Sequence, residues 1–345
     1  MKDQIHFPPS NDRCYIIAEA GSNHNGSFEQ ALSLIDVACE AGADAVKFQT
    51  FRARQLYTRN AGVSDYLGVK KPIYDIIQDM EMPYDWIKKL SDYCHKKKIH
   101  FLSSVFDFES VDQVDPFVPV HKIASYEMNH IPLIEYVARK NKPVIISTGT
   151  ADLDEVDETV RVFRKVSKAP LVLMQCTAKY PAPLSSLNVR AVHTLRERFR
   201  LPVGLSDHSR DPVIGPVTAV AQGASVIEKH FTLSNQLPGP DHPFALEPHE
   251  LQIMVRRIRE AEEALGNGEK VMLPVEKELR SFARRSIFTV TNIAKGEKIT
   301  DQNIGVLRCG KVKGKLTPRD YATVLGKKAV RTIKADSALA FEDIK

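Results

Sequence analysis

The chain has 345 residues, of which 43% are hydrophobic and 26% are charged. At roughly 100–200 residues per domain, this length allows two or three domains, or one α/β barrel with an addition. The composition excludes wholesale disorder. The formal charge of +5 is mild and spread along the sequence without a basic tail, so we expect anionic small molecules, and no nucleic acid, as ligands.

The sequence predicts a cytoplasmic protein that does not enter a membrane. The longest stretch without a charge, Pro212 to Ile227, is too short for a membrane span and is broken by glycine and proline. The N-terminus lacks the apolar segment of a secretory signal. The five cysteines show no CxxC spacing, which favours a reducing compartment.

Eight short apolar runs rich in β-branched residues recur along the first 232 residues. Each is followed by a polar cluster and then by a segment of helical period, which is typical of a parallel sheet. Eight such units predict a closed (β/α)8 barrel. An open doubly wound sheet is the alternative, but no GxGxxG follows a strand. The predicted strands are 14–21, 45–49, 100–106, 121–127, 143–149, 170–177, 202–209 and 225–232.

The first interval illustrates the helical signal. Apolar residues recur from Phe28 to Cys39 at the spacing of an amphipathic helix. Ser27 and Gln30 predict a capping box at its start, and Gly42 predicts its end.

The pattern changes after Leu265, where turn signals begin to recur every eight to twelve positions. We therefore predict a catalytic barrel over residues 1–265, a linker over 266–285 and a small β-rich domain over 286–345. Several short strands are expected in that last domain, from segments such as SIFTVTNI, NIGVLRCG, VKGKLT and GKKAVRTIKADSAL.

Every predicted barrel strand ends in polar residues. Buried polar side chains are costly unless they are satisfied, and the C-terminal ends of barrel strands line one open mouth. The sequence therefore predicts one shared polar cavity. Its candidate residues are Glu19, Lys47, Gln49, Ser104, Lys122, Ser125, Glu127, Ser147, Thr148, Thr177, Ser206, Asp207, His208, Glu228 and His230.

Lys47 and Lys122, on separate strands, form with the hydroxyl groups a cradle for a phosphate or carboxylate. The alternative is that each lysine makes a structural ion pair. Glu19, Glu127, Glu228 and Asp241 could act as general acids or bases, hold sugar hydroxyls, or pair with the lysines. Tyr180 follows the sixth strand, where it either meets a ligand or packs on the rim.

His208 and His230 end the seventh and eighth strands, which are neighbours in a barrel. Two neutral imidazoles there could share one divalent metal ion, with water and substrate completing the shell. A core histidine bonded to a backbone carbonyl is the alternative for each. His24, in GSNHNGS, is expected to shape the first loop.

The ordered motifs AEAGSNHNG, VKFQTF, KIASYE, ISTG, CTAKYPAP, GLSDHS, EKHFT and GPDHPFALEP, followed by RRSIF and the last sixty residues, resemble the sialic acid (nonulosonate) synthase family. The resemblance covers essentially the whole chain. It implies a (β/α)8 barrel followed by an antifreeze-like, or SAF, domain. It also implies a metal-dependent transferase that condenses phosphoenolpyruvate with the open-chain form of an N-acetylated hexose such as N-acetylmannosamine, giving a nine-carbon 2-keto acid and phosphate.

The same resemblance assigns roles to individual residues. It implies phosphoenolpyruvate binding by Lys47, Lys122, Ser104, Ser125, Ser147 and Ser206. At Ala178, where several members have Asn or Ser, a hydrogen bond to phosphoenolpyruvate is either missing or replaced by one from Thr177. It implies His208 and His230 as ligands of Mn2+ or Mg2+, with Glu19 near the reacting carbons. It implies that the sugar is held by Gln49, Glu127, Tyr180 and Asp241, and by Arg308 from the partner in a domain-swapped homodimer.

Three alternatives stay open. Members that make pseudaminate, legionaminate or spore-coat polysaccharide precursors share most of these motifs, and the stretch 52–71 is expected to influence the choice of sugar. A related barrel acting on a phosphorylated sugar needs a second phosphate cradle, for which Lys229 is the main spare lysine. A non-catalytic sugar-binding protein is disfavoured, because a scaffold has no need of these mouth residues.

Overall fold

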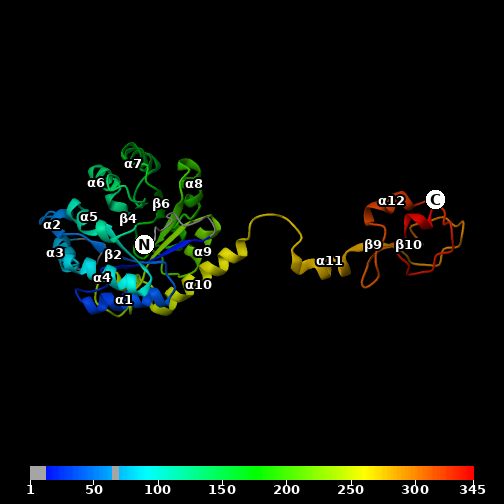
Figure 1. Cartoon of the computed structure of the whole chain (residues 1–345), viewed down its shortest axis with the longest axis horizontal. Coiled ribbons are helices and arrows are strands. Elements are labelled where there is room, and N and C mark those ends of the chain that lie inside the picture. The colour runs from blue at the N-terminus through cyan, green and yellow to red at the C-terminus, as the bar shows by residue number, and fades with distance from the viewer. Residues whose placement is uncertain (1–12, 64–69) are drawn as a thin grey trace. The chain divides into compact units, whose positions relative to one another are not determined.

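The computed structural model describes residues 13–63 and 70–345. The N-terminal residues 1–12, considered above for a signal sequence, and residues 64–69 of the stretch 52–71 lie outside the described residues. The chain divides into two compact units, one that runs to Gly266 and one from Asn267 to Lys345, shown in Figure 1. Each unit is described by itself below.

The first unit is a closed barrel of eight parallel strands in sequence order. The last strand pairs with the first, with Glu19 opposite His230, so the sheet has no open edge. The (β/α)8 prediction is confirmed and the open-sheet alternative is wrong. The strands are β1 (Tyr15–Gly21), β2 (Ala45–Thr50), β3 (His100–Val105), β4 (His121–Ile123), β5 (Val144–Ser147), β6 (Leu171–Cys176), β7 (Val203–Asp207) and β8 (Val226–His230).

Helices surround the strands on the outside (Figure 1). Two short helices, α2 (Ala53–Leu56) and α3 (Ile73–Asp79), lie in the connection after β2. The others alternate with the strands along the chain. They are α1 (Phe28–Glu40), α4 (Tyr84–Lys97), α5 (Phe108–Val114), α6 (Ile131–Ala138), α7 (Leu153–Val166), α8 (Arg190–Phe199), α9 (Ile214–Ala221) and α10 (Pro248–Leu265).

The start of α1 differs in one detail from its prediction. The Ser27 side chain accepts a hydrogen bond from the Gln30 backbone N–H, as a helix cap does. The Gln30 side chain donates instead to the carbonyl of Asn23, so the reciprocal bond of a capping box is absent there. Gly42 follows the helix with φ of +81°, a conformation that favours glycine.

Alternation along the strands separates two apolar regions. Ile16, Val46 and Ile146 point outward and pack against the helices in the large core. Ile17, Leu102 and other inward residues fill the barrel interior with a second apolar cluster. Successive strand residues face opposite sides, so the polar residues two positions further along point into the barrel, nearer its C-terminal mouth.

The second unit contains less regular strand than predicted. Helix α11 (Lys277–Ala283) precedes two antiparallel strands, β9 (Arg285–Thr289) and β10 (Ile304–Arg308), and α12 (Tyr321–Val324) follows. The segments after residue 310 make isolated bridges such as Ile293 to Ile333 in place of the expected strands. Turns at Gly296, Gly310 and Gly326, each with positive φ, interrupt the chain too often for longer pairing. An apolar cluster of residues from these segments forms the core of the unit.

None of the helices in the described part of the chain has the length and apolar character needed to cross a membrane.

A buried ion pair joins β7 to β8 on the outside of the barrel. Asp207 and Lys229 alternate with the inward Ser206 and Glu228, and their charged atoms are 2.7 Å apart. Lys229 Nζ also donates to the carbonyl oxygen of Ser209 at 2.6 Å. Both charged side chains are almost completely buried. The pair therefore ties together the two strand ends that carry His208 and His230.

Replacing Lys229 with methionine should leave the Asp207 carboxylate buried without its cation and destabilise the barrel by about 3–5 kcal/mol. Urea unfolding followed by circular dichroism measures this change. Lys88→Met is the matched control, because the Lys88–Asp92 pair is exposed and such pairs contribute about 0–1 kcal/mol. Equal unfolding midpoints for the two variants would contradict the structural role of the pair.

Candidate functional site at the barrel mouth

Lys47 lies at the centre of a buried polar cluster at the C-terminal ends of the strands. Its Nζ atom is 2.8 Å from Glu19 Oε2 and donates to Ser104 Oγ at 2.8 Å. Gln49 donates to the second oxygen of Glu19 at 2.8 Å. These side chains come from the first three strands, so the closure of the barrel brings them together.

Lys122 forms the other half of the cluster. Its Nζ atom donates to Ser147 Oγ at 2.8 Å and lies 3.9 Å from Glu228 Oε1. The same Glu228 oxygen accepts from Ser206 at 3.1 Å, and its other oxygen is 3.6 Å from Lys47 Nζ. Glu228 therefore bridges the two lysines. The structural ion pairs considered from the sequence are present, and they hold the two lysine side chains together in one buried cluster.

The pKa values of this cluster follow from burial and mutual charge. Burial raises the pKa of Glu19 to about 7, although Lys47 opposes the rise. Burial also acts to raise the pKa of Glu228, but Lys122 and Lys47 outweigh it and the net shift is downward. The pKa of Lys122 is lowered by burial, whereas that of Lys47 is raised because its two glutamates outweigh burial. Glu228 therefore stays ionised, and Glu19 is placed to exchange a proton near neutral pH.

His208 and His230 face the same cavity, with ring centroids 5.5 Å apart. His208 Nδ1 is bonded to the carbonyl of Thr177 at 2.9 Å, which leaves Nε2 for a ligand. Burial lowers the pKa of His230 well below its usual value, so this ring is neutral. Its buried Nδ1 makes no hydrogen bond among the described residues and lies 3.6 Å from Asp241 Oδ2.

These features fit a site in which two imidazoles hold one divalent cation. Within residues 13–63 and 70–345, no group of three His, Cys, Asp or Glu side chains is arranged to hold a metal ion. The two imidazoles would therefore be its protein ligands, and the metal site stays a prediction from the sequence.

Aromatic side chains and one acid cover the histidines. The Tyr180 ring lies 4.1 Å from the His208 ring, and Phe244 lies 5.2 Å from both Tyr180 and His230. Asp241 precedes Phe244 in the same loop, and burial raises the pKa of its carboxyl to about 6. A Cβ atom added to Gly21 would lie 3.1 Å from Asp241 Oδ2. The loop after β8 therefore packs closely against the end of β1.

Ser125 and Glu127 follow β4 in a single 3-10 turn. Ser125 Oγ accepts from the Gly149 backbone N–H at 3.0 Å. Burial raises the pKa of Glu127 to about 7, against the opposing effect of Lys122. One oxygen of Glu127 is buried and has no hydrogen-bond partner in the described part of the chain. This acid is therefore available to a ligand.

Several expected residues lie apart from the cluster or meet it differently. Asp207, which was expected at the mouth, lies on the outside of the barrel because it alternates with the inward Ser206, and it pairs there with Lys229. The Thr148 hydroxyl donates to the carbonyl of Met174 at 2.9 Å. The Thr177 hydroxyl donates to the carbonyl of Ser186 at 2.7 Å, so its backbone carbonyl, and not its side chain, supports His208. His24 is buried edge-on against Trp86 and accepts from the Gly26 N–H, which agrees with a role in shaping the first loop. Arg308 is exposed on β10 of the second unit.

The sequence analysis missed two neighbours of the histidines. Cys176 Sγ lies 3.8 Å from His208 Nδ1, and Phe244 packs on both Tyr180 and His230. Cys176 is the last residue of β6, so its strand-end position is the signal that could have found it. Phe244 belongs to an irregular loop, and no periodicity marks it.

Comparisons with known proteins agree with this geometry. Residues 34–270 match the model of the NeuB family, and residues 284–345 match the SAF domain. The chain is 44% identical to the spore coat polysaccharide biosynthesis protein SpsE of Bacillus subtilis, over 96% of this chain and 93% of that protein. It is 38% identical to N,N'-diacetyllegionaminic acid synthase of Legionella pneumophila, over 97% of this chain and 96% of that protein.

Among solved structures, the chain is similar to N-acetylneuraminic acid (sialic acid) synthetase of Leptospira borgpetersenii, with 34% identity and a TM-score of 0.72. That match covers 78% of this chain and 91% of the other. The barrel with its polar mouth, the appended small unit and these matches lead to one conclusion: the chain belongs to the NeuB family and carries a C-terminal SAF domain.

Proposed function

We propose that this protein condenses phosphoenolpyruvate with the open-chain form of an N-acetylated hexose, giving a nine-carbon 2-keto acid and phosphate. One observation carries the proposal: two lysines, two glutamates and two histidines from the ends of five strands lie together at the barrel mouth. The names of the relatives, which include synthases of legionaminic, pseudaminic and N-acetylneuraminic acids, support the same reaction class.

Phosphoenolpyruvate is proposed to bind at the two lysines. Its phosphate and carboxylate groups are anionic, and the ammonium groups of Lys47 and Lys122 balance that charge inside a buried site. The hydroxyls that surround them would orient the enol ester. These hydroxyls belong to Ser104, Ser125, Ser147 and Ser206, with a lesser part for Thr177, whose hydroxyl already has a partner.

His208 and His230 are proposed to hold Mn2+ or Mg2+. When bound, such an ion would act as a Lewis acid towards the aldehyde oxygen of the sugar. His208 Nδ1 donates to the carbonyl of Thr177, so Nε2 is the nitrogen that the neutral ring would offer to the ion. The Asp207–Lys229 pair behind the strands holds both histidines in register.

The sugar is proposed to lie under the loop after β8. Asp241, Glu127, Gln49 and Tyr180 surround this space and offer carboxylates, an amide and a phenol to hydroxyl groups. Arg308 would complete the site from the partner subunit of a domain-swapped homodimer, contacting the acyl group of the sugar. Ala178 offers no side-chain hydrogen bond to either substrate.

Chemically, the methylene carbon of phosphoenolpyruvate forms a bond to the aldehyde carbon, and the aldehyde oxygen takes up a proton to become a hydroxyl. Positive character then develops at the phosphate-bearing carbon. Water adds there while Glu19 accepts one of its protons, which replaces the proton taken up by the new hydroxyl. The bond between this carbon and the bridging oxygen then breaks, and the ketone forms as the second proton of the water leaves with phosphate. Glu19 suits this task because its pKa is raised to about 7 and Lys47 stabilises its ionised form.

The structure weakens one alternative. Lys229, the main spare lysine for binding a phosphorylated sugar, is bonded to Asp207 and Ser209 on the outside of the barrel. An unphosphorylated acceptor is therefore favoured, with N-acetylmannosamine and a 6-deoxy diacetamido sugar both possible in shape and chemistry. We also place the protein in the cytoplasm, since all five cysteines are free thiols.

Incubation with phosphoenolpyruvate, Mn2+ and a panel of N-acetylated hexoses tests the proposed reaction. One hexose should give a product heavier than the sugar by the pyruvate unit, together with one equivalent of phosphate. Mass spectrometry and a phosphate assay measure the two. Absence of phosphate release with every hexose, phosphorylated or not, would favour a non-catalytic sugar-binding protein.

Replacing His208 with alanine should remove one metal ligand and lower Mn2+ affinity by at least about tenfold, with loss of turnover. Calorimetric titration of Mn2+ measures binding apart from activity. His193→Ala is the matched control, because His193 lies on the exposed face of α8. Unchanged Mn2+ affinity in His208→Ala would remove this residue from the proposed metal site.

Replacing Glu19 with glutamine should lower kcat by about 10²–10⁴, the usual contribution of a general base. A base acts when deprotonated, so wild-type kcat should rise as pH increases through the Glu19 pKa of about 7. That limb of the profile should vanish in Glu19→Gln and persist in the exposed control Glu158→Gln. A Glu19→Gln profile with the wild-type limb would assign the base elsewhere.

A further inference from the structure

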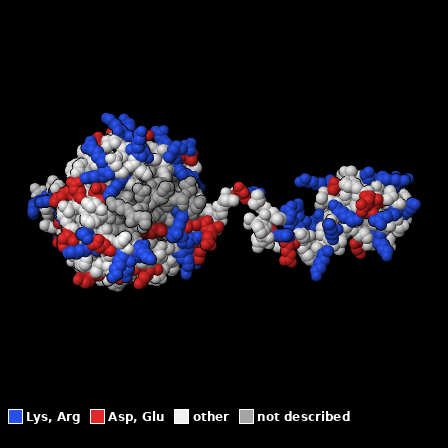
Figure 2. Space-filling view, in the orientation of Figure 1, with Lys and Arg blue, Asp and Glu red and all other residues white. Residues whose placement is uncertain are grey.

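Positive charge is concentrated in the second unit. Residues 267–345 contain 17 Lys and Arg against 9 Asp and Glu, a net charge of +8, whereas residues 1–266 have a net charge of −3. The expectation of an evenly spread charge is therefore wrong. Figure 2 shows the basic side chains gathered over this unit, while both signs are mixed on the barrel. This surplus indicates an anionic partner for the unit.

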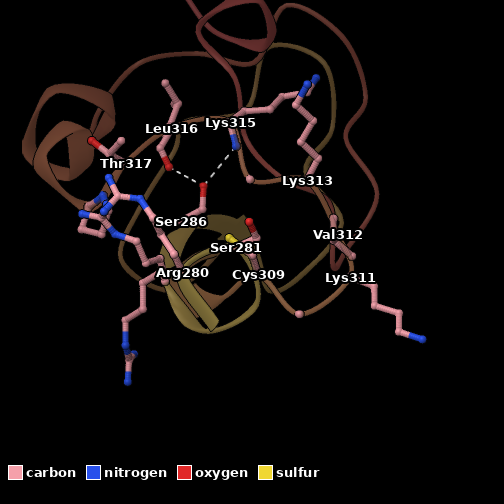
Figure 3. Close-up of a pocket in the computed structure, with 15 residues that line it drawn as sticks. Arg280, Ser281, Ser286, Cys309, Lys311, Val312, Lys313, Lys315, Leu316 and Thr317 are labelled. Atoms are coloured by element: carbon pink, nitrogen blue, oxygen red, sulfur yellow. Dashed lines mark hydrogen bonds between the residues drawn. The ribbon is translucent and has the colours of Figure 1, made fainter. Parts of the chain in front are cut away.

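A groove of about 620 Å3 lies within this unit, between the end of α11, the start of β9 and the loop after β10 (Figure 3). The loop is fixed to the helix end by two backbone hydrogen bonds, from Cys309 N–H to the Arg284 carbonyl and from Gly310 N–H to the Phe282 carbonyl. Gly314 approaches Ser286 so closely that a Cβ atom would lie 2.7 Å from Ser286 Cβ. The groove is therefore preformed by the backbone.

Cations line this groove without balancing acids. Six of its fifteen lining residues are Lys or Arg and none is Asp or Glu. Among the described residues, only Lys315 of these six has a carboxylate within ion-pair distance, that of Glu342 at 3.1 Å. The others are Arg280, Arg284, Arg285, Lys311 and Lys313.

One lining cation of the groove faces another arginine in the strand pair. Arg285 lies directly opposite Arg308 in the β9–β10 ladder. Both arginines are exposed, so the positive charge of the groove continues onto this end of the strand pair.

We propose that this groove binds the phosphoanhydride chain of a nucleoside triphosphate or of inorganic polyphosphate. Arginine and lysine are the side chains that bind phosphate oxygens, and several spread cations match a chain of phosphates better than one small anion. Figure 3 shows Arg280 and Lys311 extending to different sides of the groove. The volume falls within the range of about 300–1,000 Å3 typical of small-ligand sites.

The lining argues against single-stranded nucleic acid as the occupant. Such proteins combine a basic groove with aromatic side chains on which bases stack. The lining of this groove contains no Phe, Tyr, Trp or His. Recognition therefore rests on the phosphate chain. This inference goes beyond the condensation reaction and does not depend on it.

The test is calorimetric titration of the full chain with tripolyphosphate, ATP and CTP, without divalent ions, because polyphosphates chelate metals. Ionic strength is held at about 0.1 M, where exposed charges are screened beyond about 10 Å. Lys311→Glu/Lys313→Glu should weaken tripolyphosphate binding by at least about tenfold, because each substitution replaces an attractive charge with a repulsive one. Lys295→Glu/Lys298→Glu is the matched control, with the same charge change at exposed residues outside the groove.

Equal affinities for tripolyphosphate and the nucleotides would assign the site to the phosphate chain alone, whereas tighter nucleotide binding would add a contact to the nucleoside. Either result supports the proposal if the control binds like wild type. Three results would overturn it: no binding of any of the three probes, equal binding by both double variants, or tighter binding of a single-stranded oligonucleotide. Sedimentation of the same variants detects a fourth result that would overturn the proposal: the groove variant changes the oligomeric state and nothing else.

Discussion

The site depends on the burial of four alternating charges. Glu19, Lys47, Glu228 and Lys122 follow one another within ion-pair distance across the barrel mouth. Each charge alone would be expensive to remove from water, and only their mutual attraction and the surrounding hydroxyls make their burial tolerable. The cluster consequently holds two buried ammonium groups, whose effect on an anionic ligand would be stronger than that of exposed ones.

The closed barrel brings the charged side chains of this cluster together. Seven of its strands contribute a charged or hydroxyl side chain and β6 ends in Cys176, and the parallel arrangement brings every C-terminal end to one mouth. The interior below the charges is filled by apolar side chains. Outside, the Asp207–Lys229 pair locks the ends of β7 and β8 together and so supports the two histidines from behind. The barrel thus keeps its supporting contacts in the interior and on the outside, apart from the polar cluster at its mouth.

The second unit has a different electrostatic character. Its apolar core is small, its regular strands are two, and its surplus of basic residues contrasts with the slightly acidic first unit. Those charged side chains lie largely at the surface, where water solvates them. The unit is therefore suited to bind anions at its surface, in contrast to the buried cluster of the barrel.

The sequence by itself determined the barrel, its eight strands and the inventory of polar residues at their ends. Hydrophobic periodicity is strong in long alternating units, and position along a strand fixes which end of a barrel a residue occupies. It predicted His208 and His230 together for this reason, and their rings do lie 5.5 Å apart. It predicted the small second domain but overestimated its regular strands, because single bridges between turns leave no periodic pattern.

Only the tertiary structure decided how those polar residues pair. That Glu228 bridges Lys47 and Lys122 while Lys229 points away to Asp207 depends on strand alternation and barrel closure. The contacts of Cys176 and Phe244 with the histidines also join separate segments of the chain, and the Thr177 hydroxyl turns to the carbonyl of Ser186 within its own loop. Such pairings are set by distances in space, and residue spacing along the chain carries no record of them.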